Sequence, residues 1–273
     1  MTGVWGDDHA AAFAAIDRTA APGVFIGWMD DVGGLPGVVR TRQLAAAALD
    51  LSPGQRVLDV GCGAGDATVA LAHSVDPRGR VVGVDASSTM LAAARDRAQR
   101  LGLAVDFPAG DALDLPFRDG AFDACRCERV LVHVPDTERA LAEMVRVTRP
   151  GGRVAVVDID GDATLVDSPD RDLTRIVVTT LSDSYRNGWI GRQLLRLFGR
   201  HGLTAVSGET VTASFPFPVA ARILVPHLRA LEADGTVAGL AIRRWWDDLE
   251  AADQAGTFFF AITLFVVAGQ KPG

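Results

Sequence analysis

The sequence predicts an α/β fold in which a doubly wound, mostly parallel sheet carries helices on both faces. Short apolar runs alternate with helical patterns along the chain, an order that is typical of parallel sheets. The first clear run, residues 57–60, leads into three glycines at alternate positions, Gly61, Gly63 and Gly65, which let the backbone approach a ligand closely. The chain has 273 residues, of which 48% are hydrophobic, enough for one sizeable core with a lid.

The glycine-rich turn is flanked by two carboxylates. A dinucleotide-binding turn has the pattern Gly-x-Gly-x-x-Gly and seats a pyrophosphate on the amides of the following helix. Here Asp66 occupies the place of the third glycine, and Asp59 lies two residues before Gly61. Negative charges disfavour an anion there and favour an ammonium or sulfonium group. The alternative interpretation is that both acids only cap the helix and shape the turn.

The motif Asp59-x-Gly61-x-Gly63-x-Gly65 resembles the first motif of class I S-adenosylmethionine-dependent methyltransferases, of the small-molecule type that modifies quinones and secondary metabolites. Further segments follow in the family's order, at residues 81–85, 110–117, 122–127, 131–136 and 149–152. The resemblance implies a Rossmann-like sheet of seven strands with S-adenosylmethionine as the cofactor. It is specific over residues 52–160 and holds only in outline elsewhere.

The cofactor is expected at the edge of the sheet where the carboxyl ends of the parallel strands meet. The resemblance implies that Asp85 accepts hydrogen bonds from the ribose hydroxyls and Asp111 from the adenine amine, with Cys127 near the methionine part. Dehydrogenases use an acid like Asp85 in the same way, so the glycine-rich turn separates the two families. The predicted cofactor-binding residues are Asp59, Gly61, Gly63, Gly65, Asp85, Ala86, Met90, Gly110, Asp111, Ala112 and Cys127.

The chain is expected to divide into three parts. Residues 1–53 form an N-terminal helical lid segment, residues 54–160 the cofactor-binding core, and residues 161–273 the rest of the sheet. In the core, a serine cap, an apolar face and a terminal Gly102 predict a helix over residues 88–101. Two runs, residues 203–214 and 258–269, match the family's closing antiparallel pair. The insertion between them, residues 215–256, is too long for a hairpin turn.

The segments outside the core are rich in large apolar side chains: Trp5, Phe13, Phe25, Trp28 and Met29 in the first, Trp245 and Trp246 in the insertion. We interpret both segments as lids that cover an apolar acceptor. The alternative is that both pack as ordinary helices on the core. Arg40 and Arg42 can pair with the methionine carboxylate, although a solvated position near a helix start is favoured.

Methyl transfer depends mainly on orientation and a dry pocket, so few residues qualify as catalytic. His133 follows the fourth strand and is the best candidate for a general base, because an imidazole titrates near neutrality. A structural role for His133 at the pocket edge is equally open. Asp160, with Asp162, is expected just past the fifth strand, where it either contacts an acceptor or shapes a turn. Glu128 and Arg129 face the same edge, and Arg129 can pair with a carboxylate.

Composition narrows the classes of partner. A net charge of -7 and a pI of about 5.2 argue against nucleic acid and anionic membranes, which need a basic surface. The N-terminus lacks a secretory pattern and the three cysteines form no disulfide framework, which indicates a cytoplasmic protein without a metal site. Cys125 and Cys127 share one face of their strand and are expected to be buried thiols.

The expected partner is a small hydrophobic or aromatic methyl acceptor, and the oligomeric state is left open. The segment after the fourth strand lacks the Asn-Pro-Pro-Tyr pattern of enzymes that methylate amide nitrogens of nucleic acids or proteins. The motifs do not encode whether oxygen, nitrogen or carbon receives the methyl group. Cyclisation or rearrangement on the same cofactor-binding fold stays open, as does a non-catalytic interaction module. A nicotinamide-dependent oxidoreductase is disfavoured by Asp59 and Asp66.

Overall fold

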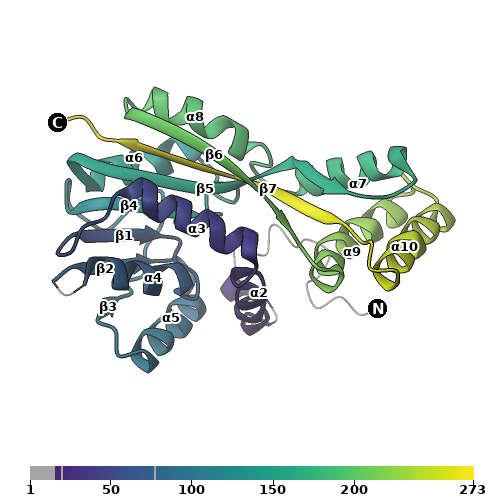
Figure 1. Cartoon of the computed structure of the whole chain (residues 1–273), viewed down its shortest axis with the longest axis horizontal. Helices are drawn as coiled ribbons and strands as arrows, with labels where there is room; N and C mark the ends of the chain where they lie inside the picture. Colours follow the sequence, from purple (N-terminus) through teal and green to yellow (C-terminus); the bar gives the residue numbers. More distant parts are fainter. Residues whose placement is uncertain (1–15, 20, 77) are drawn as a thin grey trace.

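The computed structural model describes residues 16–19, 21–76 and 78–273. Within this part of the chain, seven strands form one sheet in the order β3-β2-β1-β4-β5-β7-β6 (Figure 1). The strands are β1 (Arg56–Val60), β2 (Arg80–Val84), β3 (Val105–Asp106), β4 (Phe122–Glu128), β5 (Thr148–Val166), β6 (Thr204–Ser214) and β7 (Phe260–Gln270). The strands from β3 to β5 are parallel, and β7 runs antiparallel to both β5 and β6. The predicted fold class is confirmed.

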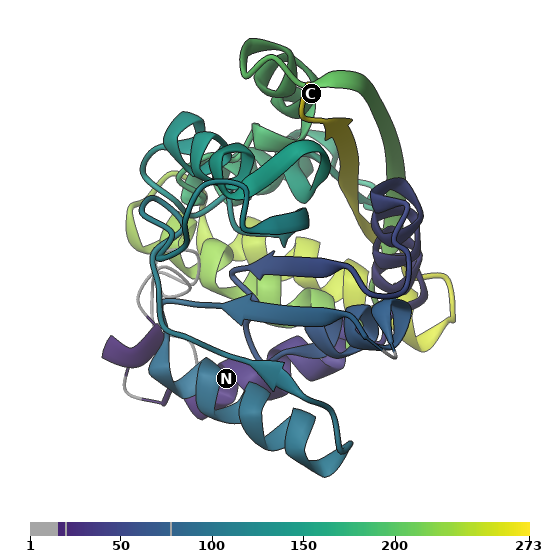
Figure 2. The same ribbon diagram turned by 90° about the vertical axis from the view of Figure 1, so that its left-hand side faces the viewer.

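Helices cover both faces of the sheet. They are η1 (Ile16–Arg18), α2 (Gly23–Gly33), α3 (Pro36–Leu49), α4 (Asp66–Val75), α5 (Ser88–Arg100), α6 (Thr137–Val147), α7 (Arg171–Ser184), α8 (Ile190–Arg200), α9 (Phe217–Ala233) and α10 (Gly239–Gln254). Figure 2 shows α3 and α6 on opposite sides of the strands. No helix in the described ranges is long and apolar enough to cross a bilayer.

The alternation of side chains along each strand decides which face a residue joins. Val57 of β1 and Ala124 of β4 pack with Leu49 of α3 and Leu71 of α4. The next residue along β4, Cys125, therefore points to the other face, into the main core. Cys127 follows two residues later and joins Cys125 there, with both thiols fully buried. The prediction of two buried thiols on one face is confirmed.

Helix α3, in the N-terminal segment, packs on the sheet as part of the core. Helix α3 packs on β5, β6 and β7, and a Cβ added at Gly37 would lie 2.4 Å from the Cβ of Ala213 on β6. This contact requires a glycine, because any side chain would push helix and strand apart. Among the described elements of this segment, η1 and α2 border the ligand cavity described below, and α3 reaches it with Val38 and Arg42. Trp5 and Phe13 lie outside the described residues.

Strand β5 is longer than the sequence indicates. It continues to Val166 because β7 pairs with it along almost its whole length, with a bulge between Asp160 and Thr164. The prediction that Asp160 and Asp162 lie just past this strand was therefore wrong. Asp and Gly are common in turns, and residues 160–162 are Asp-Gly-Asp, but antiparallel pairing with a distant strand overrides this local propensity.

The far ends of β5, β6 and β7 carry a second helical layer, with α7, α9 and α10 packed together beside them (Figure 1). Trp245 of α10 is 1% exposed, and its Nε1 donates a hydrogen bond of 2.9 Å to Oγ1 of Thr174 on α7. Helix α10 thus packs as part of the core. The predicted insertion is divided between a helix that borders the cavity, α9, and one that supports it, α10.

Candidate functional site

A cavity of about 610 Å³ opens at the carboxyl ends of β1, β2 and β4. This is where ligands bind in doubly wound folds, and the volume is that of a typical small-molecule site. One half is polar and is built from the turns after β1 and β2. The other half is mostly apolar and is closed by Trp28, Val32, Phe215, Ile223, Ile262 and Leu264.

The turn after β1 forms one wall of the polar half. Gly61, Gly63 and Gly65 have φ values of 64°, 53° and 87°, a region that other residues rarely adopt. A Cβ added at Gly61 would lie only 2.3 Å from Cγ2 of Val130. The turn therefore presents backbone atoms to the cavity. Its conformation and its close contact with Val130 require glycine. Gly65 itself caps α4 and does not line the cavity.

Asp85 follows β2 and anchors the opposite wall. Its Oδ2 accepts a hydrogen bond of 2.9 Å from the amide of Gly63, and its Oδ1 accepts one of 2.8 Å from the amide of Ser87. Burial raises the pKa of Asp85, and the two amides partly oppose this. Each carboxylate oxygen keeps a second lone pair for a ligand hydroxyl. The geometry thus fits a ribose at this position.

An unpredicted residue, Asp17, closes the site from the N-terminal segment. Its carboxylate accepts hydrogen bonds from Ser87 Oγ at 2.6 Å, Ser88 N at 2.7 Å and Thr89 N at 3.2 Å. These bonds lower the pKa of Asp17 far below its ordinary value and satisfy free amides at the start of α5. The chain separation of about 70 residues explains why no local pattern reveals this contact.

The loop after β3 supplies the third wall. The amide of Gly110 donates to the carbonyl of Asp85 at 3.1 Å, and Asp111 lies exposed at the cavity border. Oδ1 of Asp111 accepts from the amide of Leu113 at 2.9 Å, which shapes the turn. Asp85 and Asp111 are therefore brought to one cavity, as the sequence predicts.

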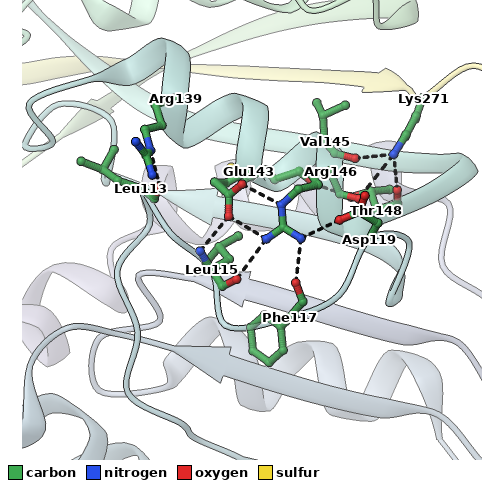
Figure 3. Close-up of polar contacts among 11 residues, drawn as sticks. Leu113, Leu115, Phe117, Asp119, Arg139, Glu143, Val145, Arg146, Thr148 and Lys271 are labelled. Atoms are coloured by element: carbon green, nitrogen blue, oxygen red, sulfur yellow. Dashed lines mark hydrogen bonds and ion pairs between the residues drawn. The ribbon is translucent and has the colours of Figure 1, made fainter.

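Helix α6 fixes this loop (Figure 3). Glu143 accepts from the amide of Leu115 at 2.8 Å, while Arg146 donates to the carbonyls of Leu115 at 3.0 Å and Phe117 at 2.7 Å. Arg146 also pairs with Glu143, which lowers the pKa of Glu143. The end of α6 is capped in turn by the chain's only lysine, Lys271, whose Nζ donates to three carbonyls. The loop backbone is thereby held independently of any ligand.

A network of buried charges forms the base of the cavity. Glu128, at the end of β4, accepts from Arg42 Nε at 3.0 Å and from Arg126 Nη2 at 2.6 Å. Asp59 accepts from Thr68 Oγ1 at 2.7 Å and lies 3.7 Å from Arg126 Nε. Burial raises the pKa of Asp59, whereas for Glu128 the arginines outweigh burial and lower the pKa to about 2. Arg42 is thus enclosed, and the expectation of a solvated side chain was wrong.

The pairing of these carboxylates changes the charge argument for the glycine-rich turn. Asp59 faces Arg126, and Asp66 pairs with Arg97 at 2.7 Å. Neither acid is an isolated negative charge. Discrimination against a pyrophosphate therefore depends on the turn geometry as much as on charge.

The described part of the chain places the polar side chains of Arg129, His133 and Tyr185 in the apolar half. The rings of His133 and Tyr185 are 6.1 Å apart. Burial, and next the nearby Arg129, lower the pKa of His133 to about 4, so the imidazole is neutral at pH 7. A neutral imidazole can accept a proton, but so low a pKa makes it a weak base.

In addition to Gly65, three predicted site residues lie away from the cavity: Met90, Cys127 and Asp160. Met90 is 1% exposed within the core, and the side chain of Cys127 points to the opposite face of β4. Asp160 is fully buried, and both of its carboxylate oxygens accept from Arg192. The structure thus gives Asp160 a partner in α8 and does not bring it to the site. The predicted residues that do line the cavity are Asp59, Gly61, Gly63, Asp85, Ala86, Gly110, Asp111, Ala112 and His133.

The two lid segments meet above the cavity. Asp31 of α2 pairs with Arg222 of α9 at 2.7 Å, and the Arg222 guanidinium lies 4.7 Å from the ring centre of Trp28. Helix α2 contributes Trp28, Met29 and Val32 to the cavity wall. These contacts agree with the interpretation of α2 and α9 as covers.

Replacement of His133 by glutamine is expected to change how stability depends on pH. Because the folded-state pKa of about 4 is below the unfolded value of about 6.5, the neutral ring stabilises the fold above pH 6.5. This stabilisation is lost as the pH falls from 6.5 towards 4. The wild-type chain should therefore lose more free energy of unfolding than His133→Gln between pH 7 and pH 5, as measured by urea titration. The exposed His73, changed to glutamine, is the control and should follow the wild type; parallel curves for all three would contradict the burial of His133.

Comparison with known proteins relates this site to a family. A model described as a methyltransferase domain matches residues 51–188, half of the chain. An uncharacterised 37.1 kDa protein of a Streptomyces fradiae transposon is 38% identical over 90% of this chain and 71% of that protein. The 2-phytyl-1,4-naphthoquinone methyltransferase of Synechococcus elongatus is 46% identical over 43% of this chain. The match spans about half the length of that enzyme.

Among solved structures, the [4+2]-cyclase SpnF resembles the chain with a TM-score of 0.55 and 27% identity. The likeness covers 86% of this chain and 81% of SpnF. It therefore extends beyond residues 51–188, the part that the domain model matches.

Proposed function

Because the chain belongs to the class I S-adenosylmethionine-dependent methyltransferases of the small-molecule type, we propose that it methylates a nucleophilic oxygen, nitrogen or carbon of a small hydrophobic or aromatic metabolite. S-adenosylmethionine is the cofactor of this family. The single observation that carries the proposed acceptor class is the apolar half of the cavity, joined directly to the nucleotide-binding half. A quinone methyltransferase among the relatives and a net charge of -7 support a small acceptor over a nucleic acid.

The walls of the polar half fit the cofactor. A bound S-adenosylmethionine supplies an electrophilic methyl group on a sulfonium. Backbone at Gly61 and Gly63 allows close approach, and Asp85 offers acceptors for ribose hydroxyls. Arg42 carries a guanidinium at the base of the cavity, and this group can donate to the methionine carboxylate as well as to Glu128. The remaining task of the protein is to orient the acceptor and exclude water, which α2 and α9 perform.

Isothermal titration with S-adenosylmethionine, S-adenosylhomocysteine and NAD tests this proposal. We expect micromolar binding of the two adenosyl compounds and none of NAD, because the turn offers no pyrophosphate site. Binding would then justify a screen of naphthoquinols and hydroxylated aromatics with a labelled methyl donor. Binding of NAD alone, or of none of the three, would contradict the proposal; the last result would favour a non-catalytic module.

A second candidate keeps the cofactor but not the transfer. The likeness to a [4+2]-cyclase and the largely apolar acceptor half favour cyclisation of a flexible substrate as the alternative. The two candidates differ in stoichiometry, since methyl transfer releases one S-adenosylhomocysteine per product. A substrate converted without release of S-adenosylhomocysteine would identify the second candidate.

A further inference from the structure

Among the residues that the structure describes, the charges around the acceptor half do not balance. Three guanidinium groups, from Arg42, Arg126 and Arg129, share the carboxylate of Glu128. Asp59 lies near Arg126, but Arg126 Nε is buried without a hydrogen-bond partner. Three guanidinium groups therefore face one close carboxylate, Glu128, and a more distant one, Asp59, where the two halves of the cavity join. A buried excess of this kind is costly unless a ligand compensates it.

Arg129 is the member of the set with the most freedom to contact a ligand. Its Nη2 lies 3.4 Å from Glu128 Oε1, whereas Arg42 and Arg126 approach the same carboxylate to 3.0 and 2.6 Å. Its side chain lines the cavity and is 26% exposed. Glu128 thus mainly satisfies the other two arginines.

The backbone of Arg129 is held in an unusual conformation that aims this side chain. Its φ is 56°, in the left-handed region that residues other than glycine rarely adopt. The amide of Arg129 donates to the carbonyl of Val157 on β5 at 2.7 Å, which fixes the conformation. Strain of this kind persists where the surrounding structure enforces it, and it is concentrated at ligand sites.

The other described ionisable groups near Arg129 supply only part of a compensating charge. Burial raises the pKa of Tyr185 to about 12, and the pKa of His133 is lowered to about 4, so both rings are neutral at pH 7. Burial raises the pKa of Asp158 to about 7, so this carboxyl is only about half ionised at pH 7, and its oxygens already accept from the amides of Val132 and Ile159. Burial also lowers the pKa of Arg129, and Arg42 adds repulsion.

On the basis of the proposed function, we propose that Arg129 binds the acceptor as an oxyanion, so that the substrate is an apolar molecule with an acidic hydroxyl, such as an enol or an electron-poor phenol. The hydroxyl gives its proton to solvent before or during binding. An electron pair of the delocalised oxyanion, a lone pair on oxygen or the π pair at the conjugated carbon, then forms the bond to the methyl carbon. The carbon–sulfur bond breaks and leaves its electron pair on sulfur. An anion and a sulfonium thus become two neutral products, a change that a dry cavity favours.

This assignment removes the need for a strong base. His133 is too weak a base to ionise an ordinary alcohol efficiently, but an acidic hydroxyl ionises near neutrality without help. The contribution of His133 is then to orient the oxyanion by one hydrogen bond. Arg129 acts by charge, through contact with the reacting group.

Coloured phenols test the proposal without a known substrate. The probes are 4-nitrophenol, 4-nitro-1-naphthol and 2-hydroxy-1,4-naphthoquinone, whose anions absorb at longer wavelength than the neutral forms. Each is titrated with pH in the presence of the protein saturated with S-adenosylhomocysteine. For at least one probe, we expect binding to lower its apparent pKa by about one to three units. This shift should disappear in Arg129→Gln and return largely in Arg129→Lys, which keeps the cation.

Controls separate this inference from the proposed function. Arg40→Gln removes an exposed arginine two positions from Arg42 and should leave the probe shift unchanged. Binding of S-adenosylhomocysteine is measured for every variant and should persist in Arg129→Gln, because Arg42 and Arg126 still satisfy Glu128. Intact cofactor binding with no probe shifted, or with an equal shift in Arg129→Gln, would overturn the role of Arg129 alone. Failure of the wild-type chain to bind S-adenosylhomocysteine would overturn the proposed function.

Discussion

Replacement of Arg126 by methionine is expected to lower the free energy of unfolding by about 3 to 5 kcal/mol. Arg126 is 3% exposed and contacts Glu128, with Asp59 also near its guanidinium. Methionine fills much of the volume but removes the cation nearest to Asp59 and the shortest ion pair of Glu128, so that both buried carboxylates depend on more distant arginines. The loss of stability therefore comes from stranded charge more than from lost packing, and urea unfolding at pH 7 measures it.

The control for this prediction is Arg149→Gln. Arg149 also pairs with a carboxylate, Asp123, at 2.7 Å, but its side chain is 43% exposed, and we expect a loss of about 1 kcal/mol or less. Acid should also reduce the deficit of Arg126→Met. The depressed pKa of Glu128 stabilises the wild type above about pH 4.5, and this contribution is lost as the pH falls towards 2. An equal loss of unfolding free energy in the two variants at pH 7 would show that the buried carboxylates do not depend on Arg126 for compensation of their charge.

Replacement of Asp85 by alanine is expected to weaken binding of S-adenosylmethionine by about 1 to 3 kcal/mol, or roughly 5- to 150-fold. The variant removes the acceptors for ribose hydroxyls. It also releases the amides of Gly63 and Ser87, so that two walls of the polar half lose their connection. Isothermal titration gives the affinity, and thermal unfolding reports any separate effect on the fold.

Asp106→Ala is the matched control for Asp85. Asp106 is an exposed acid on the neighbouring β3, pairs with Arg80 and lies outside the cavity. Its removal should change cofactor affinity by less than about twofold, since an exposed pair contributes little. If Asp85→Ala binds as tightly as Asp106→Ala, Asp85 has no part in holding the cofactor.

Local patterns predicted the parallel strands and the turn because both depend on neighbours in sequence. The apolar run before Gly61 and the conformational freedom of glycine determine that turn within about ten residues. The same reasoning placed Asp85 and Asp111 at one edge, since strand ends converge there. Their positions follow from the order of elements, which the sequence displays.

The electrostatic partners could not be predicted in this way. Arg42 and Glu128 are 86 residues apart, and Asp17 reaches serines about 70 residues away. Only the packing of α3 and η1 against the sheet brings these groups together. The side of β4 to which Cys127 points likewise required knowledge of which helices cover each face. Asp160 had a suitable residue type and an approximate location, but its pairing with Arg192 depends on α8.

The pairing of β6 and β7 restricts how ligands enter and leave. Their ladder is regular from Ser207 to Ser214, so the strands that complete the core also carry the distal helices. A hinge between core and distal helices would have to break this ladder. By contrast, η1 and α2 are joined to their surroundings by side-chain contacts, including the partly exposed pair of Asp31 and Arg222. We therefore expect cofactor and acceptor to enter and leave on the η1 and α2 side, and substitutions there to alter ligand exchange rates before they alter equilibrium stability.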